Sequence, residues 1–191
     1  NVKEHLYNVD QLKKAYEPYI PQKLISLFGK NDIRQISTED ETTIKDAAIL
    51  VLDAMGFSKA VSKADVQEMF SFVNSALEKI VSGVENEGGV VLQFTDTGMF
   101  AFFQNMPDKA LKAAVEIQKS LQCLPKKLGG EKGEKIVFSA GMILGDINVG
   151  VIGAEDRMEI RAVSPEMSFA RYLQKVSGIY NLGILIDETF K

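Results

Sequence analysis

The chain has 191 residues, 46% of them hydrophobic, and a formal net charge of −4 from 22 basic and 26 acidic residues. This size and composition predict one globular domain with a short N-terminal appendage. No basic block stands out, so we expect no nucleic-acid partner. With one cysteine, Cys123, and one histidine, His5, the chain cannot form an internal disulfide and has almost no material for a zinc site or histidine catalysis.

The sequence shows neither an apolar stretch long enough to span a bilayer nor a signal peptide. The lone cysteine suits a reducing compartment, so we expect a cytoplasmic location. The chain begins at Asn1 rather than at Met and ends in mid-pattern at Lys191. We interpret it as the cytoplasmic domain of a longer protein, which could itself be membrane-bound or carry a sensor.

The N-terminal segment, residues 1–40, reads as a helical lead-in followed by a connector. One helix covers Val9 to Tyr16, and Pro21 begins a second helix that ends before Gly29. Residues 30–45 are polar and acidic and predict a connector. The main domain is assigned to residues 41–191.

The next segment predicts a strand, a long helix and a hairpin. Residues 46–53 have the composition of a buried strand. Ser62 and Asp65 form a possible capping box for the long helix, which ends at Gly88-Gly89. Residues 90–94 and 98–103 then predict a hairpin.

The C-terminal half continues the alternation of helices and strands. A helix starts near Pro107, and the Gly/Lys stretch from Lys126 to Lys135 predicts a solvated loop rather than a phosphate-binding loop. Gly145-Asp146 has the chemistry of a hairpin turn, and we interpret it so rather than as a third carboxylate ligand. The remaining predicted elements are strands at 136–144, 147–152, 158–163 and 182–186, and a helix from Ser164 to about Ser177. This order favours an α+β fold with a mostly antiparallel sheet and helices packed on it.

Two aspartates, 43 positions apart, are the candidate metal ligands: Asp53 closes the buried strand, and Asp96 lies in the turn of the first hairpin. If their strands are neighbours, the carboxylates meet at one sheet edge, as in sites that hold divalent ions for phosphoryl transfer. The alternative is that Asp53 is an ordinary strand-end residue and that Asp96 has only a role in the turn.

Several motifs together resemble the class III nucleotidyl cyclases, the family of adenylate and guanylate cyclases. Residues 51–58 resemble the family's F-x-D-I-x-G-F-T, and residues 94–102 resemble I-G-D-x-x-M-A-x-F. Residues 141–145 and 150–153 resemble G-I-H-x-G and G-x-I-G, and 164–170 resembles the segment that ends V-N-x-A-x-R. The resemblance covers roughly residues 15–190, including a Tyr-Ile-Pro that resembles F-V-P. It implies a ferredoxin-like cyclase homology domain.

In that family two domains pair head to tail, and the resemblance assigns residue roles by position. It implies Asp53 and Asp96 as ligands of Mg²⁺ or Mn²⁺. The positions of the two base-recognising residues, normally Lys and Asp or Thr, hold Leu92 and Arg161, and those of the Asn–Arg pair hold Ser168 and Tyr172. Arg171 is one place off and starts from a different helix face, and Thr95 replaces the Gly before the second metal Asp. Arg161 could be a compensating base or phosphate reader, or a surface charge.

These substitutions predict a degenerate cyclase domain. Loss of one transition-state donor costs on the order of 10²–10³ in rate, so a homodimer should have near-background activity and act as a pseudo-enzyme or dimerisation module in cyclic-nucleotide signalling. The alternatives are the metal-bearing half of a heterodimeric cyclase and an active homodimeric adenylate cyclase with substituted residues. The expected ligands are ATP or GTP with a divalent metal.

The expected partner is a second copy or a cyclase-domain paralogue. The pairing face would combine the 98–103 hairpin strand with the helix from Ser164. Every position from Met99 to Phe103 is apolar, so we expect one of the pairs Met99/Phe103 and Phe100/Phe102 to need cover from outside the domain.

Overall fold

The structure is a computed structural model that describes residues 2–129, 134–154 and 157–190. It divides into two compact units, Asn1–Thr42 with Gly150–Ile160, and Thr43–Val149 with Arg161–Lys191. Within the described residues no helix is long and apolar enough to cross a membrane.

The first unit holds the lead-in. Its helices are α1, Val2–Tyr16, and α2, Gln22–Ser26, followed by the 3₁₀ turn η1, Ile33–Gln35. Lys30 Nζ lies 2.6 Å from both carboxylate oxygens of Asp40, which orders the connector. Both predicted helices are present, the first with an earlier start, and the assignment of residues 1–40 as a separate lead-in stays a prediction.

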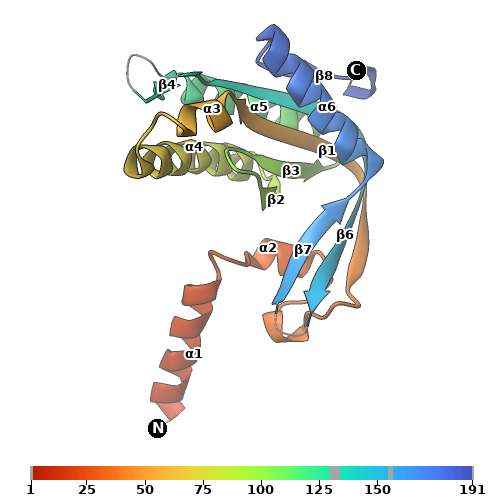
Figure 1. Cartoon of the computed structure of the whole chain (residues 1–191). Helices are drawn as coiled ribbons and strands as arrows, with labels where there is room; N and C mark the ends of the chain where they lie inside the picture. Colours follow the sequence, from red (N-terminus) through yellow and green to blue (C-terminus); the bar gives the residue numbers. More distant parts are fainter. Residues whose placement is uncertain (1, 130–133, 155–156, 191) are drawn as a thin grey trace. The chain divides into compact units, whose positions relative to one another are not determined.

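The main sheet has six strands in the order β2-β3-β1-β6-β7, with β8 paired to β6 (Figure 1). β3 is antiparallel to both β1 and β2, whereas β8 is parallel to β6. The α+β fold is therefore as predicted. The strands are β1 Glu41–Met55, β2 Val90–Phe94, β3 Met99–Gln104, β6 Val137–Ala154, β7 Arg157–Val163 and β8 Ile184–Ile186.

One sheet face of the second unit packs on two helices, α4, Val66–Asn86, and α5, Pro107–Leu121. Leu50 and Leu52 of β1 point to this face and are fully buried against both helices. Ile80 of α4 and Ile117 of α5 belong to the same core. Burial of such side chains contributes about 1.5–3 kcal/mol each, so this core fixes the register of β1 and β3.

The opposite sheet face carries α6, Pro165–Tyr180. Gly141 of β6 alternates with core residues of the first face and so points to the second. A Cβ atom on Gly141 would lie 2.1 Å from the carbonyl oxygen of Ala170, so only glycine allows α6 to approach this closely. Ser164 caps α6 by accepting a hydrogen bond from the backbone N–H of Met167, as the sequence predicts.

Two local predictions are wrong. No turn occurs at Gly145-Asp146, because β6 runs straight through it and the Asp146 carboxylate accepts hydrogen bonds from the Asp46 N–H and from Lys45 Nζ on β1. The capping box is also wrong, because Asp65 itself caps α4 by accepting from the Glu68 N–H at 2.7 Å. In both cases tertiary or local hydrogen bonds outweigh a short sequence signal.

The remaining short elements belong to the second unit. The predicted solvated loop is framed by a two-stranded pair, β4 and β5, whose connecting residues 130–133 lie outside the described residues. β1 also begins earlier than predicted, inside the segment assigned to the connector. The short elements are α3 Phe57–Val61, β4 Lys127–Leu128, β5 Glu134–Lys135 and the 3₁₀ turn η3 Glu188–Phe190.

Candidate functional site

Asp53 lies at the end of β1, next to the turn that joins β2 and β3. The ladder between β1 and β3 ends at the pair Leu52–Met99, so Asp53 faces the turn residues themselves. The Thr97 hydroxyl donates to Asp53 Oδ1 at 2.5 Å, and the Ala54 N–H donates to the same oxygen at 2.8 Å. Thr97 is buried, so the carboxylate is held by the turn rather than left to rotate.

The turn itself is pressed against β1. A Cβ on Gly98 would lie 1.9 Å from the carbonyl oxygen of Leu52, so glycine is required there. The Thr95 N–H donates to the Gly98 carbonyl at 3.0 Å and closes the turn, with Asp96 exposed at its tip. The fold therefore brings both candidate ligands to one end of neighbouring strands. Whether their carboxylates share one ion stays a prediction.

The two carboxylates fit a divalent ion that a bound ligand also coordinates. Among the described residues no three His, Cys, Asp or Glu side chains group as metal ligands. Mg²⁺ typically binds through one or two carboxylates and fills its shell with water and phosphate oxygens, which matches Asp53 with Asp96. Thr95, which precedes Asp96 in the chain, has a buried Oγ1 without a hydrogen-bond partner in the described part of the chain.

Leu92, at the position of a base-recognising Lys, is buried at 5% exposure. It is the extra residue of a β-bulge, because Val91 pairs with Ala101 and Gln93 with Phe100. The sequence offered no signal for this bulge. Leu92 cannot contact a ligand from inside the sheet.

The positions of the Asn–Arg pair lie on the exposed surface of α6. Ser168 and Tyr172 are both exposed and one turn apart, as helix geometry predicts. The Tyr172 ring stacks on Phe169, with centroids 6.1 Å apart and an interplanar angle of 17°. This surface is apolar where the family's motif places charge. Arg161 lies on β7 and is half-buried.

Arg171 makes a contact that the sequence analysis did not predict. Its guanidinium carbon is 5.0 Å from the centroid of the Phe100 ring, a cation–π contact. Phe100 pairs with Val51, which has the same parity as Asp53, so all three side chains share one sheet face. The one-residue offset from the family position therefore does not remove Arg171 from the face that carries Asp53.

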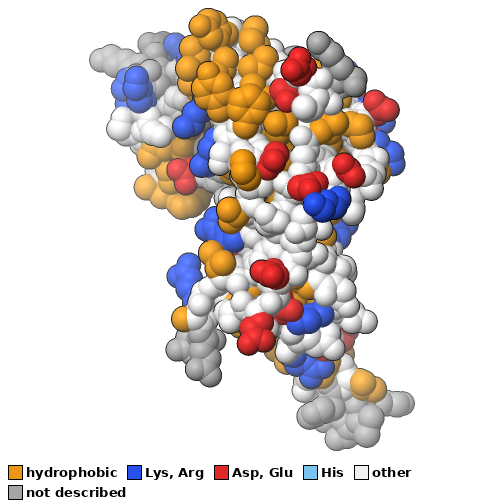
Figure 2. Space-filling view, turned by 90° about the vertical axis from the view of Figure 1, so that its right-hand side faces the viewer, with side chains coloured by type: hydrophobic (Ala, Val, Ile, Leu, Met, Phe, Trp, Pro, Cys, Tyr) orange, Lys and Arg blue, Asp and Glu red, His pale blue; other side chains and the backbone are white. Residues whose placement is uncertain are grey.

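The apolar run of β3 is buried along its whole length. Phe100 and Phe102 are only 5% and 2% exposed, so the expectation that they need cover from outside the chain is wrong. Exposed apolar side chains gather on α6 and just after it instead. Figure 2 shows hydrophobic side chains concentrated over the upper part of the face where Figure 1 places α6. We call this set the α6 apolar stripe: Phe169, Tyr172, Ile179, Tyr180 and Leu182.

Comparisons with known proteins agree with this fold. A terminal-differentiation-specific adenylate cyclase of Dictyostelium discoideum is 23% identical over 188 residues, which is 96% of this chain and 9% of the relative. A bacterial light-regulated adenylyl cyclase superposes with a TM-score of 0.81 at 18% identity, covering 99% of this chain and 56% of that one. The guanylate cyclase domain of RhGC from Catenaria anguillulae, solved in complex with GTP, gives 0.65 at 14% identity, covering 78% and 81%. No family model matches the sequence.

The chain therefore has the fold of class III nucleotidyl cyclase catalytic domains. It spans about a tenth of the length of the curated relative it matches. Fold alone does not give activity, which depends on the residues of the site.

Proposed function

We propose that this domain is a cytoplasmic class III cyclase-like signalling module that binds a metal–nucleotide complex through Asp53 and Asp96 but has near-background cyclase activity alone. The observation that carries the proposal is the contrast, within the second unit, between the candidate metal ligand and the remaining substrate positions. The turn holds Asp53 firmly, whereas the family's remaining substrate positions are a buried Leu92 and an aromatic-stacked Tyr172.

The physical reason is the charge that cyclisation develops. A bound Mg²⁺ or Mn²⁺ would neutralise phosphate oxygens and order the polyphosphate. Phosphoryl transfer also needs donors aimed at the developing charge, and loss of one commonly costs on the order of 10²–10³ in rate. Neither Ser168 nor Tyr172 carries the required positive charge. We therefore expect the domain to bind metal but to form cyclic nucleotide only at a background rate.

The test is a cyclase assay on the purified chain with Mn²⁺ or Mg²⁺ and either ATP or GTP, with the product measured by mass spectrometry. We expect background product, together with metal-dependent nucleotide binding in calorimetry. Asp53→Asn is the matched variant, because its amide oxygen still accepts from Thr97 and Ala54. It should abolish metal-dependent binding. Robust turnover that this variant abolishes would instead establish an active homodimer.

A second candidate is the metal-bearing half of a heterodimer. It is favoured by a contrast between site positions, because Asp53 is held by hydrogen bonds from Thr97 and the Ala54 N–H, whereas Leu92 is buried. Mixing the chain with a cyclase domain that has the Lys, Asp or Thr, Asn and Arg residues but lacks its own metal aspartates tests this. Turnover in the mixture that neither domain shows alone would support it.

The partner of the module is proposed to be a second copy or a cyclase-domain paralogue that docks on the α6 apolar stripe. Monomeric proteins rarely expose contiguous apolar patches of this kind. The stripe begins at Phe169 on the helix that Ser164 caps, the predicted pairing helix, and it does not include the buried β3 run. Pairing through α6 would place Ser168 and Tyr172 in the interface.

A further inference from the structure

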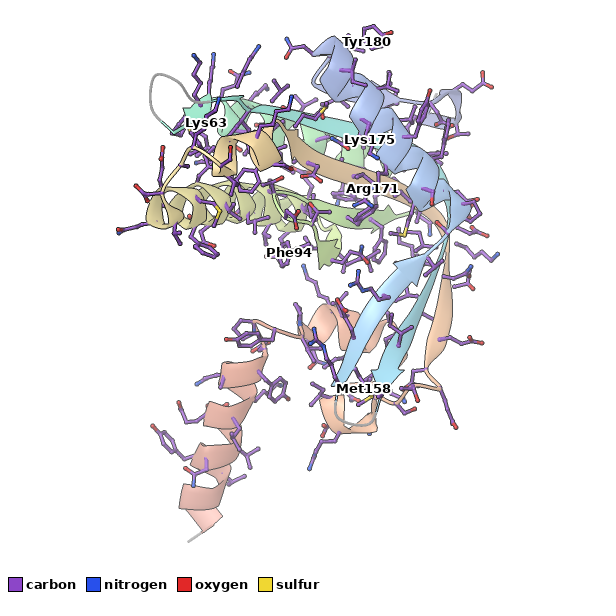
Figure 3. All side chains as sticks on the ribbon, in the orientation of Figure 1. Lys63, Phe94, Met158, Arg171, Lys175 and Tyr180 are labelled. Atoms are coloured by element: carbon purple, nitrogen blue, oxygen red, sulfur yellow. The ribbon has the colours of Figure 1, made fainter. Side chains whose placement is uncertain are left out.

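The end of α6 packs on the end of β1 through one thioether. Met55 is the last residue of β1. A Cβ atom on Gly178 would overlap the Met55 sulfur and would lie 2.9 Å from Met55 Cγ. Figure 3 shows Lys175 and Tyr180 along α6, and Gly178 lies between them in the last turn of the helix. The thioether of Met55 therefore fills the space that a side chain at position 178 would need.

The Met55 sulfur also borders a buried polar pair. The same Cβ atom on Gly178 would lie 2.8 Å from Ser139 Oγ, so the Ser139 hydroxyl and the sulfur are neighbours. Ser139 is fully buried, and its oxygen accepts a hydrogen bond from the Gln174 amide at 2.9 Å. Gly178 is buried as well. The sulfur thus touches both the α6 backbone and a hydrogen-bonded pair that ties α6 to β6.

Met55 differs in exposure from the core methionines of the second unit. Met55 is half-buried and the following Gly56 is exposed, whereas Met99 and Met142 are fully buried. Oxidation of a thioether to a sulfoxide depends on how well an oxidant reaches the sulfur, and the product disrupts the packing of an apolar contact. Met55 therefore combines an accessible position with close packing against a helix.

We propose that Met55 is a site of reversible oxidation by hydrogen peroxide, and that its sulfoxide loosens the last two turns of α6. The sulfur lone pair attacks one peroxide oxygen, and an S–O bond forms as the O–O bond breaks. The leaving oxygen takes up the proton of the transferred oxygen and departs as water, so the sulfur loses the two electrons that the peroxide gains. The sulfoxide is larger and polar, and it no longer fits against the Gly178 backbone.

The last turn of α6 has few apolar side chains of its own in the interior. Ile179 and Tyr180 are exposed, so the buried surface of this turn comes from Ser177 and Gly178. Ser177 contributes a buried hydroxyl that has no hydrogen-bond partner in the described part of the chain. Segments with few buried apolar contacts open locally at low free energy. Loss of the Met55 contact should therefore be felt at this end of α6. The inference does not depend on metal or nucleotide binding.

The test treats the full chain with hydrogen peroxide in a Cys123→Ser background, because the exposed Cys123 would otherwise react as well. Peptide mass spectrometry follows the oxidation of each methionine, and hydrogen exchange follows the amides of α6. We expect Met55 to oxidise after the exposed Met158 and before the fully buried core methionines. Exchange of the amides at 174–180 should then rise at least tenfold, and methionine sulfoxide reductases should reverse the rise. If Met55 resists oxidation in the folded chain, the proposal is wrong.

Three variants of the same background separate Met55 from the other methionines. Met55→Leu keeps the volume but cannot be oxidised, so peroxide should leave its α6 exchange within twofold. Met158→Leu is the matched control, because Met158 is a more exposed thioether that belongs to the first unit, and it should respond like the background chain. Met55→Gln puts a polar group in the same space and should speed α6 exchange without peroxide. The proposal is overturned if Met55→Leu responds to peroxide like the background chain, or if Met55→Gln leaves α6 exchange unchanged.

Discussion

The strand end that carries Asp53 and the exposed surface of α6 belong to the same unit but present opposite chemistry. At Asp53, a buried Thr97 and a glycine-only contact hold a carboxylate in place. On α6, Phe169 and Tyr172 stack in solvent where the family's motif places an amide and a guanidinium. Backbone packing enforces the first region, whereas only side-chain choice determines the second. Catalytic capacity is therefore expected to be recovered or lost on α6 and metal capacity at the turn.

The largest effect is expected from Gly98→Ala at the turn. The added Cβ would lie 1.9 Å from the Leu52 carbonyl oxygen, so backbone must move. We expect a loss of about 3 kcal/mol in the free energy of unfolding, the upper range for one substitution. Urea unfolding measures it. Gly150→Ala is the control, since its Cβ would meet nothing closer than 3.5 Å. Equal stability of the two variants would show that the turn is not clamped on β1.

Restoring charge on α6 is expected to have the next largest effect. The double substitution Ser168→Asn and Tyr172→Arg returns the family's pair to two exposed positions one turn apart. If the Asp53 corner holds metal, cyclase activity should rise by on the order of 10²-fold above background. Ser168→Asn with Tyr172→Gln is the uncharged control and should stay at background. A folded double variant that binds nucleotide but shows no rise would place the missing chemistry elsewhere, at Leu92 or Arg161.

Charging the α6 apolar stripe should weaken self-association. Ile179→Glu places a carboxylate at a position that is 67% exposed in the isolated chain. Desolvating that carboxylate in an interface should raise the dimer dissociation constant about tenfold, equivalent to roughly 1.4 kcal/mol. Sedimentation at high concentration measures the change. Val66→Glu adds the same charge to an exposed apolar site on α4 and should have no effect. If the wild-type chain stays monomeric at every concentration, the proposal that the α6 apolar stripe mediates pairing is wrong.

The smallest effect is expected at Asp146. This residue does not lie in the predicted turn but links two neighbouring strands. Its hydrogen bonds from Lys45 and from the Asp46 N–H lower its pKa below the ordinary 3.8. A lowered folded-state pKa means that the stabilisation is complete above pH 3.8 and is lost as the pH falls through the lower value.

Asp146→Asn removes this dependence. The wild type should therefore lose more stability than the variant between about pH 5 and pH 2, measured by thermal unfolding across that range. The difference should be small because the pair is exposed and screened by solvent and salt. Parallel pH profiles for the two proteins would contradict the assigned role.

Sequence reasoning located the Asp53 strand, the β2–β3 hairpin and the start of α6, because each has a local cause. The apolar run of β1, the turn residues around Asp96 and the Ser164 cap are all visible as short patterns. The turn predicted at Gly145-Asp146 was wrong because a dipeptide that favours a turn also fits a strand. Here the aspartate accepts a hydrogen bond from the neighbouring strand. The contact of Arg171 with Phe100 could not be predicted, because counting helix faces does not give the reach of a long side chain over the sheet.

The β-bulge at Leu92 makes a lysine at this position hard to accommodate. A single change of Leu92 to Lys would put an ammonium group at a position that is 5% exposed, where burial favours its neutral form. To present a charged tip, the strand would have to expel the extra residue, and that shift would move its neighbours to the other face. Val91 and Gln93 would then leave their present partners on β3. Base recognition by a lysine at this strand would thus need coordinated changes along the hairpin, each unfavourable alone.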